Sequence, residues 1–522
     1  MCGIIATESK IKQLKIGLKK IENRGPDQVR VIEKDDHVFM FNRLAIMGLD
    51  ESGMQPFIHD NSIIVTNGEI YNYKDLKSLT PDYTYLSESD CEVLLPLYSK
   101  LGVEMFYYLD AEFATIIYDA DKKSLIAARD PLGIRPLFYG YSKSDDKIIF
   151  CSEVKGMIDY VKKVYPFPPG HYYLNGEFIK FTDIYGIKQY HSDTFDVIFK
   201  EINKRLTDAV IKRLDSDAPM GFLLSGGLDS SLVCAIAQKH LDAPIRTFSI
   251  GMETDAIDLK YAKQVAEYIG SNHTEVIITE QDVTNHLDEV IYSLESYDIT
   301  TIRASMGMYL LSKYIRENTD IKVLLTGEVS DELFGYKYTD FAPSEAAFQE
   351  ECDKRIRELY MYDVLRADRC LASNALEARV PFGDIDFVKY VMSTPPIFKM
   401  NKYDMGKFIL RKSFEGDLLP KNILFRDKAA FSDAVGHSLV DILKANANAS
   451  YSDEEYTELI TKYPINTPFT KESLLYRERF THFYPGHDHL IIDYWMPNKE
   501  WENCNVKDPS ARVLTNYGAS GI

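Results

Sequence analysis

The chain has 522 residues, and its 60 Lys and Arg against 79 Asp and Glu give a net charge of −19. With 45% hydrophobic and 12% aromatic residues, this composition is typical of a globular protein and excludes disorder as the main state. At ~100–200 residues per domain, the length indicates two or three domains. Because nucleic acids and anionic membranes would repel so acidic a chain, neither is expected as a partner, and small-molecule substrates fit better.

The sequence favours a cytoplasmic protein without structural cysteine sites. No run approaches the ~20 apolar residues that span a bilayer, and the first residues lack the apolar core of a signal peptide. The 7 cysteines are scattered and have no CxxC spacing, so neither a disulfide framework nor a structural zinc site is indicated.

The first 185 or so residues are turn-punctuated and rich in β-branched residues, which predicts short, largely antiparallel strands. The clearest predicted strands are Ser62–Thr66, Phe113–Tyr118, Ser124–Ala128 and Lys147–Phe150. A helix is predicted at Ser89–Gly102, with Gly102 as its stop. A polar stretch precedes a predicted helix at Val197–Leu214, and we place the domain boundary there, giving domains 1–190 and 191–522.

In the second domain, apolar strands alternate with helices. The predicted strands are Ile245–Ile250, Thr274–Ile278 and Lys322–Leu325, and the predicted helices are Leu259–Ile269 and Ser305–Glu317. This alternation predicts a parallel sheet with helices on both faces, and ligands then bind at the carboxyl ends of the strands.

The segment Ser225–Ser231, with the sequence SGGLDSS, follows an apolar strand and opens a helix. Its two glycines, its hydroxyls and the helix amino end are typical of an anion cradle. The Walker lysine is absent, so the segment suits a pyrophosphate released by cleavage at the α-phosphate better than γ-phosphate transfer. Asp229 would repel such an anion unless it ligates Mg²⁺. The alternative is a plain turn with a helix cap.

A second acidic loop, Thr326–Gly335, follows another strand, so Glu328, Asp331 and Glu332 should emerge at the same sheet edge. Carboxylates there can bind Mg²⁺ or orient an amine. Taken alone, the loop is equally an N-cap with acidic residues in the first helical turn.

Cys2 follows the initiator Met, whose removal would expose a thiol and an α-amine on one residue. The α-amine can then act as general base for the thiol. Arg43, Glu69 and Asp90 could bind the carboxylate and ammonium of a free amino acid, and Asn67 with the N–H of Gly68 could form an oxyanion hole. Taken singly, each of these residues is as well explained by packing, a surface charge or a turn.

The chain resembles, almost end to end, the glutamine-hydrolysing asparagine synthetases of the bacterial and plant type. The motifs that carry this resemblance are ordered along both halves of the chain. They are Met1-Cys-Gly-Ile4, Arg24-Gly-Pro-Asp27, Arg43-Leu44, Gln55-Pro56, Asn67-Gly-Glu-Ile-Tyr-Asn72, Ser89-Asp-Cys-Glu-Val93, Arg129-Asp-Pro-Leu-Gly133, Ser225–Ser231, Tyr297–Ser305, Glu377-Ala-Arg-Val-Pro-Phe382, Lys428 with Phe431-Ser-Asp433, Asn466-Thr-Pro468 and Tyr476-Arg-Glu478.

The resemblance implies an N-terminal-nucleophile glutaminase with an α/β/β/α antiparallel-sheet fold, joined to a parallel-sheet ATP-pyrophosphatase of the adenine nucleotide alpha hydrolase-like type. In this family Cys2 would form a glutamyl thioester, and Arg43 would bind the carboxylate of glutamine. Glu69 and Asp90 would hold its α-amino group, while Asn67 and Gly68 would stabilise the oxyanion.

For the second domain, the resemblance implies that ATP and aspartate form β-aspartyl-AMP, which tunnelled ammonia converts to asparagine with release of AMP and pyrophosphate. Glu328 would handle the ammonia proton, Lys428 would neutralise phosphate charge, and Thr301 and Arg303 would lie beside the intermediate. Mg²⁺ would bind Asp229 and Asp331, and a homodimer is expected from the family. The implied ATP-binding residues are Leu224, Ser225, Gly226, Gly227, Asp229, Ser230, Ile250, Gly251, Thr326 and Gly327.

The chain departs from the family at several positions. Asn23 replaces a His, and Val329 replaces a Gly in the acidic loop, where a β-branched residue disfavours positive φ. Gly383 and Ala429-Ala430 are expected to loosen the same part of the site as Val329, the wall around the acyl-adenylate. The alternatives are a related amidotransferase ligase that activates another carboxylate, such as a β-lactam-forming or peptide-amidating relative, and a catalytically impaired glutamine or nucleotide sensor.

Overall fold

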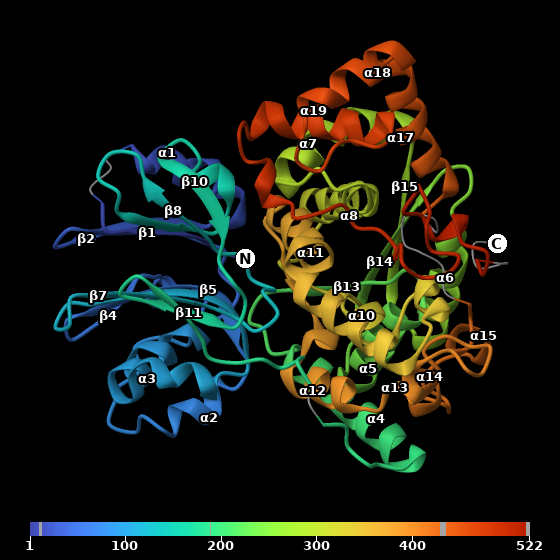
Figure 1. Cartoon of the computed structure of the whole chain (residues 1–522). Helices are drawn as coiled ribbons and strands as arrows, with labels where there is room; N and C mark the ends of the chain where they lie inside the picture. Colours follow the sequence, from blue (N-terminus) through green and yellow to red (C-terminus); the bar gives the residue numbers. More distant parts are fainter. Residues whose placement is uncertain (10–12, 188, 428–434, 518–522) are drawn as a thin grey trace.

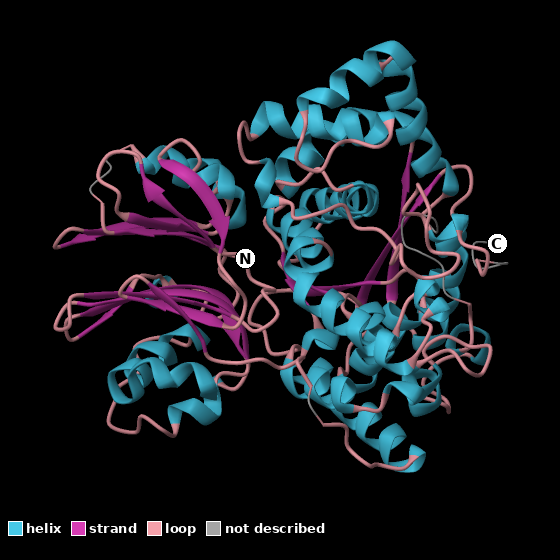
Figure 2. Cartoon of the chain, in the orientation of Figure 1, coloured by secondary structure: helices cyan, strands magenta, loops and turns pink. Residues whose placement is uncertain are grey.

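A computed structural model describes residues 1–9, 13–187, 189–427 and 435–517. The N-terminal half forms two stacked sheets beside a larger helical half that surrounds a third sheet (Figure 1). The secondary-structure view separates the strand-rich half from the helix-rich half (Figure 2). No helix in these ranges is long and apolar enough to cross a membrane.

The N-terminal half contains two six-stranded antiparallel sheets, with strand orders β10-β8-β9-β1-β3-β2 and β12-β11-β7-β6-β5-β4. Helix α1 (Leu14–Lys20) covers the first sheet, and α2 (Tyr73–Lys77) and α3 (Leu94–Leu101) cover the second (Figure 1). This confirms the predicted α/β/β/α arrangement. The strands are β1 (Gly3–Thr7), β2 (Gln28–Lys34), β3 (His37–Arg43), β4 (Phe57–His59), β5 (Ser62–Ile70), β6 (Ala111–Asp119), β7 (Ser124–Arg129), β8 (Phe138–Ser142), β9 (Ile148–Cys151), β10 (Val161–Pro166), β11 (His171–Leu174) and β12 (Glu177–Lys180).

Strand β5 shows why the sheets stack. Because alternate residues of a strand face opposite sides, Ile63 and Val65 enter the core between the sheets, whereas Ile64 packs in the core that contains α3. The predicted helix at Ser89–Gly102 is a 3₁₀ turn at Asp90–Val93 followed by α3, and Gly102 ends it with φ +59°.

The C-terminal half contains a five-stranded parallel sheet with strand order β15-β14-β13-β16-β17. Its strands are β13 (Met220–Leu223), β14 (Arg246–Met252), β15 (Asn272–Ile278), β16 (Val323–Leu325) and β17 (Glu377–Arg379). On β16, Val323 and Leu325 join one helix-covered core and Leu324 joins the other. Both faces are therefore covered, as the strand–helix alternation predicts.

The predicted helices of this half are present with small shifts at their ends. The helix predicted at Ser305–Glu317 begins earlier, because the Asp298 carboxylate accepts a hydrogen bond from the Thr301 N–H at 2.7 Å and caps its amino end. The helices are α4 (Phe195–Lys212), α5 (Leu228–His240), α6 (Ile257–Ile269), α7 (Glu280–Leu294), α8 (Ile299–Asn318), α9 (Ser330–Phe334), α10 (Glu345–Glu358), α11 (Asp363–Ala372), α12 (Ile385–Ser393), α13 (Pro396–Lys399), α14 (Phe408–Ser413), α15 (Lys421–Leu424), α17 (His437–Ser450), α18 (Asp453–Leu459) and α19 (Lys471–Phe483).

The two halves meet across buried charged side chains. Arg24 Nη1 lies 2.8 Å from Asp368 Oδ2, and Arg369 Nη1 lies 3.2 Å from Glu153 Oε1, so each pair joins the two halves. All four side chains are at most 4% exposed. Charged groups this deeply buried require paired partners, so these pairs fix how the halves dock.

Candidate active sites

The first group of predicted residues surrounds Cys2, which immediately precedes β1. The Cys2 N–H donates to Asn67 Oδ1 at 2.9 Å, which places the side chain of Asn67 on β5 against the thiol-bearing residue. The other amide atom of Asn67, Nδ2, is buried and has no hydrogen-bond partner among the described residues. An unused buried donor beside a nucleophile suits the stabilisation of a developing oxyanion.

Gly68 also lies on β5, where only glycine fits. A Cβ at this position would lie 2.4 Å from the carbonyl oxygen of Glu112 on the neighbouring strand. The half-buried thiol of Cys2 has a pKa raised by burial, so it is protonated at neutral pH. It therefore needs a base, and removal of Met1 would convert the nitrogen held by Asn67 into an α-amine that can serve as one.

Arg43 ends β3, and carbonyl groups hold its guanidinium. Its Nη1 donates to the carbonyl of Asp50 at 2.5 Å, and its Nη2 donates to the carbonyl of Gly48. No described carboxylate forms an ion pair with it, and burial lowers its pKa. A buried, positioned guanidinium without a counter-ion suits a substrate carboxylate.

Two buried carboxyl groups lie in the same domain. Burial raises the pKa of Asp90 to about 6, and burial also raises the pKa of Glu69 well above its usual range. Asp90 accepts the N–H of Ile70 at 2.7 Å, and Glu69 forms an ion pair with Arg379 at 3.0 Å. The charge of Asp90 also raises the pKa of Glu69, and an incoming ammonium would stabilise both groups as carboxylates.

The second group gathers at the carboxyl edge of the parallel sheet. The hydroxyl oxygens of Ser225 and Ser230 lie 3.0 Å apart, and the Gly227 N–H donates to Ser225 Oγ at 3.3 Å. Gly226 has φ +72°, and a Cβ there would lie 2.4 Å from the backbone nitrogen of Ala262. The loop therefore has the tight, glycine-dependent shape that an anion cradle needs.

The acidic loop approaches the first loop closely. A Cβ at Gly327 would lie 2.9 Å from the nitrogen of Ser230, so the two loops touch at this glycine. Together they line a cavity of about 220 Å³, and its wall includes these residues predicted from the sequence: Leu224, Ser225, Gly227, Asp229, Ser230, Ile250, Thr301, Arg303, Thr326, Gly327, Glu328 and Asp331. Two predicted residues, Gly226 and Gly251, do not line this cavity; a Cβ at Gly251 would lie 2.3 Å from Cβ of Ala256.

Asp229 and Asp331, the predicted metal-binding pair, share one buried cation that the sequence analysis missed. Lys407 Nζ lies 2.8 Å from Asp229 Oδ2 and 2.6 Å from Asp331 Oδ1. It also donates to Ser330 Oγ at 3.0 Å. The two carboxylates thus lie close enough together to contact one cation, and carboxylate oxygens are the ligands that Mg²⁺ prefers.

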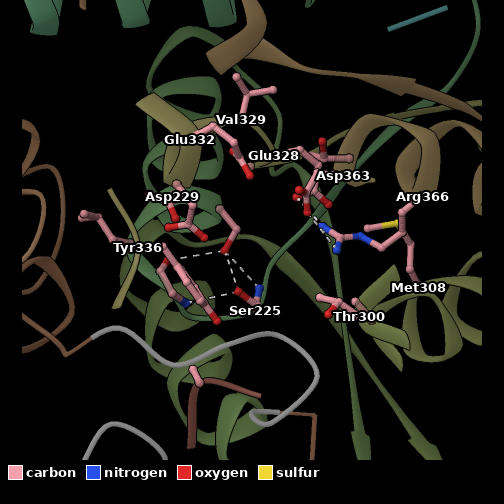
Figure 3. A pocket seen from close by; sticks show the side chains of 18 of the residues that line it. Ser225, Asp229, Thr300, Met308, Glu328, Val329, Glu332, Tyr336, Asp363 and Arg366 are labelled. Atoms are coloured by element: carbon pink, nitrogen blue, oxygen red, sulfur yellow. Dashed lines mark hydrogen bonds and ion pairs between the residues drawn. The ribbon is translucent and has the colours of Figure 1, made fainter. Parts of the chain in front are cut away.

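The opposite wall of the cavity carries a charged group that includes the predicted Glu328. Arg366 Nη2 lies 3.2 Å from Glu328 Oε2, and Arg366 Nη1 lies 3.1 Å from Asp363 Oδ1. Figure 3 shows these three side chains together, across from Asp229 and Ser225. Glu332 hydrogen-bonds Asp363, and burial raises its pKa well above its usual range. Asp363 and Arg366 are three residues apart on α11, but nothing in that spacing links them to a loop elsewhere in the chain.

Thr301 and Arg303 both reach the cavity from α8. The Thr301 hydroxyl donates to Asp298 at 2.8 Å. The Arg303 guanidinium donates to Glu472 at 2.8 Å and to Asp508 at 2.9 Å. Its charge is thus neutralised inside the protein, so Arg303 can shape the wall more readily than it can bind a second carboxylate.

Three expected departures have clear positions. Val329 lines the cavity with φ +80°, so the chain does adopt the left-handed conformation despite the β-branched side chain. Asn23 is exposed. The expectation for Gly383 is wrong, because it packs at the interface between the halves, where a Cβ would lie 3.0 Å from Ile134 Cδ1. Lys428, Ala429-Ala430 and Phe431-Ser-Asp433 lie outside the described residues.

Comparisons with known proteins match both halves. The family described as glutamine amidotransferase domain matches residues 1–168, and the family described as asparagine synthase matches residues 201–353 and 340–512. The chain belongs to the glutamine-hydrolysing asparagine synthetase family. It is 42% identical over 532 residues to a probable asparagine synthetase of Acanthamoeba polyphaga mimivirus, covering 95% of this chain and 96% of the relative.

Animal members of the family align over nearly the full length. Asparagine synthetase of Mus musculus is 42% identical over 563 residues, and that of Homo sapiens is 41% identical over 566 residues. Each alignment covers 99% of both chains. Family membership therefore extends over both candidate sites and the segment that joins them.

Proposed function

We propose that this protein makes asparagine from aspartate, with ATP as the energy source and glutamine as the nitrogen donor. The observation that carries the proposal is that one chain holds both a Cys2–Asn67 pair joined at 2.9 Å and an anion cradle on a parallel sheet. Full-length similarity to asparagine synthetases supports joining these two sites in one reaction.

In the first site, Cys2 attacks the side-chain amide of glutamine and forms a glutamyl thioester. The Asn67 Nδ2 group, which has no partner among the described residues, donates to the oxyanion. Arg43 binds the carboxylate of glutamine, while Glu69 and Asp90 bind its ammonium. Removal of Met1 supplies the α-amine that accepts the thiol proton.

In the second site, the Ser225–Ser230 loop holds the pyrophosphate end of ATP, and aspartate attacks the α-phosphate to give β-aspartyl-AMP. Asp229 and Asp331 would hold Mg²⁺, which neutralises phosphate charge when bound. Glu328, positioned by Arg366 at 3.2 Å, accepts a proton from ammonia as it attacks. Ile250 lines the pocket for the adenine ring of ATP, with Gly251 next to it in the chain. Lys428 is proposed from the resemblance alone.

The family resemblance also supports a homodimer, a cytoplasmic location and a division of the chain into domains 1–190 and 191–522. The proposed boundary falls between β12 and α4, where one sheet system ends and the other begins. Light scattering on the purified chain tests the dimer.

The decisive experiment measures asparagine and AMP formed from aspartate and ATP, with glutamine or ammonium chloride, in wild type and Cys2→Ala. We expect wild type to use both nitrogen sources and Cys2→Ala to use only ammonium. Glutamine hydrolysis without asparagine from either source would contradict the proposal and direct the search to another carboxylate substrate. ATP binding without aspartate-dependent pyrophosphate release would instead indicate a sensor.

A further inference from the structure

A second cavity, of about 410 Å³, lies beside the cavity that the Ser225–Ser231 loop lines, here called the ATP-loop cavity. The two cavities share part of their lining, including Tyr336, Lys407 and Arg411. Other parts of the second wall come from the end of α9, from Phe348 of α10, from the end of α13 and the segment that follows it, from the turn at Lys337–Phe341, and from Asn516 and Tyr517. Within the described ranges, none of the residues assigned a binding or catalytic role from the sequence lines this second cavity, although Gly335, the last residue of the acidic loop, does.

The first notable group on its wall is the ammonium of Lys399, the last residue of α13. Lys399 is 1% exposed, and its Nζ donates to Gln349 Oε1 at 2.9 Å. Among the described residues, no carboxylate lies within 4.0 Å of this nitrogen to form an ion pair. Because burial disfavours the charged form and no carboxylate compensates, the pKa of Lys399 is lowered.

Arg411 on α14 is a second cation of the same kind. It is 3% exposed, and it donates to the carbonyl oxygens of Gly406 at 2.7 Å and Leu424 at 2.5 Å. In the described ranges it also forms no ion pair with a carboxylate, and burial lowers its pKa. Carbonyl groups orient this guanidinium, and the charges of Asp229 and Asp427 act on it only from beyond ion-pair distance, so burial still dominates its pKa.

Two buried cations that form no direct ion pair within the described residues are unusual, because burying a charge without a close partner costs several kcal/mol. The cavity has acidic residues on its wall, but Asp340, Asp404 and Asp427 are all exposed. Asp340 also accepts hydrogen bonds from the amides of Asn401 and Asn516. The buried part of the wall is therefore positive, and an anion entering the cavity would supply the missing counter-charge.

We propose that the second cavity binds a phosphate-class anion, pyrophosphate or phosphate, through Lys399 and Arg411. Planar guanidinium and compact ammonium groups are the side chains that recognise phosphate oxygens. The shared wall gives pyrophosphate from the neighbouring cavity a short path to this site, and this source rests on the proposed function. The anion site itself does not.

The test uses the whole chain with the ATP-loop cavity filled by α,β-methylene ATP and Mg²⁺, titrated with pyrophosphate in a calorimeter. We expect saturable binding to wild type and at least about tenfold weaker binding to Lys399→Met. Lys402→Met is the matched control, because Lys402 is 44% exposed and lies outside the cavity wall; it should bind as wild type does. Absent binding to wild type, or equal affinity in Lys399→Met, overturns the proposal.

Thermal unfolding provides a second readout. Lys399→Met removes a buried unpaired cation, so without ligand its Tm should equal or exceed that of wild type. Pyrophosphate should raise the Tm of wild type and Lys402→Met, but not that of Lys399→Met. Equal Tm increases in all three proteins would refute the site. If Lys399→Met does not fold, Lys399→Gln keeps a donor for Gln349 and replaces it.

Parallel titrations with phosphate distinguish the two sources. Tighter binding of pyrophosphate than of phosphate identifies the reaction product as the occupant, whereas equal binding identifies free phosphate. If α,β-methylene ATP does not bind, that result counts against the proposed function alone. The pyrophosphate titration can then be repeated without the nucleotide, and its dependence on Lys399 still decides the anion site.

Discussion

Arg379 Nη2 lies 3.0 Å from Glu69 Oε2, so a guanidinium of the synthetase half pairs with a carboxylate of the glutaminase half. The carbonyl oxygen of Arg379 also accepts the N–H of Thr326 at 3.1 Å, where the acidic loop begins. A single residue of β17 thus contacts the proposed glutamine site through its side chain and the proposed ATP site through its backbone.

Arg379→Met should lower the free energy of unfolding by about 3–5 kcal/mol, because it leaves Glu69 buried without its cation. Arg357→Met is the control, since Arg357 pairs with Asp353 at 2.8 Å and is 40% exposed. Arg357→Met should lower the free energy of unfolding by less than about 1 kcal/mol. Urea denaturation measures the free energy of unfolding of both variants. Similar losses would show that the buried Arg379–Glu69 pair stabilises the protein no more than the exposed pair does.

The value of kcat/KM for glutamine should rise as pH increases from about 6, because Asp90, with a pKa of about 6, and Glu69, whose pKa is also raised, must both be ionised to pair with an ammonium. Its folded pKa exceeds the unfolded value of 3.8, so the folded state binds more protons between these values. This group's contribution to stability therefore falls as pH rises through that window.

The measurement is kcat/KM for glutamine between pH 5 and 8, in wild type and Asp90→Asn. Asp90→Asn should be weakly active and should lack the rise near pH 6. Because the charge of Asp90 raises the pKa of Glu69, the profile of wild type reports both groups rather than one. An unchanged profile in Asp90→Asn would assign the rise to another group.

Val329→Gly should be at least as stable as Val329→Ala, the reverse of the usual order. Both variants lose buried methyl groups, each worth about 0.8 kcal/mol. Only glycine also relieves the left-handed backbone at φ +80°, which costs a β-branched residue about 1–3 kcal/mol. Chemical denaturation ranks the two variants. A glycine variant about 1 kcal/mol less stable than the alanine variant would mean that this backbone stores no strain.

Lys407→Met should bind Mn²⁺ more tightly than wild type in the absence of nucleotide, by about tenfold, or 1.4 kcal/mol. Lys407 Nζ lies within 3.0 Å of both Asp229 and Asp331, so a metal ion must displace an ammonium in wild type. Electron paramagnetic resonance of free Mn²⁺ measures the affinity without turnover. Lys412→Met, which removes a partly exposed lysine of α14, should leave it unchanged. Equal affinities would show that Lys407 does not compete with the metal.

The sequence correctly predicted the loops, helices and strands that depend on contiguous residues. The two glycines at 226 and 227 and the acidic residues after β16 indicated two loops at one sheet edge, and both loops line one cavity. The helix at Val197–Leu214 and the main strands were found within a few residues, because alternation and helical spacing are local signals.

The missing parts depend on contacts between distant residues. Lys407 meets Asp229 across 178 positions, and its left-handed backbone at φ +58° has no sequence signal. Gly383 was misplaced because a motif gives the order of residues along the chain and not the surface they face. Arg303 does line the cavity, and its place beside the intermediate stays a prediction, but its partner Glu472 lies 169 positions away and has no sequence signal.

The pairs Arg24–Asp368 and Arg369–Glu153 limit how this protein could be rebuilt. Each half alone would expose, to solvent or to a different partner domain, charged groups that are now buried and paired with groups of opposite sign. A replacement glutaminase half without Arg24 and Glu153 would remove one cation from Asp368 and one carboxylate from Arg369, although Arg369 would keep Glu295 at 2.9 Å. The ammonia-producing half is thus a co-adapted part of this chain and not an exchangeable module.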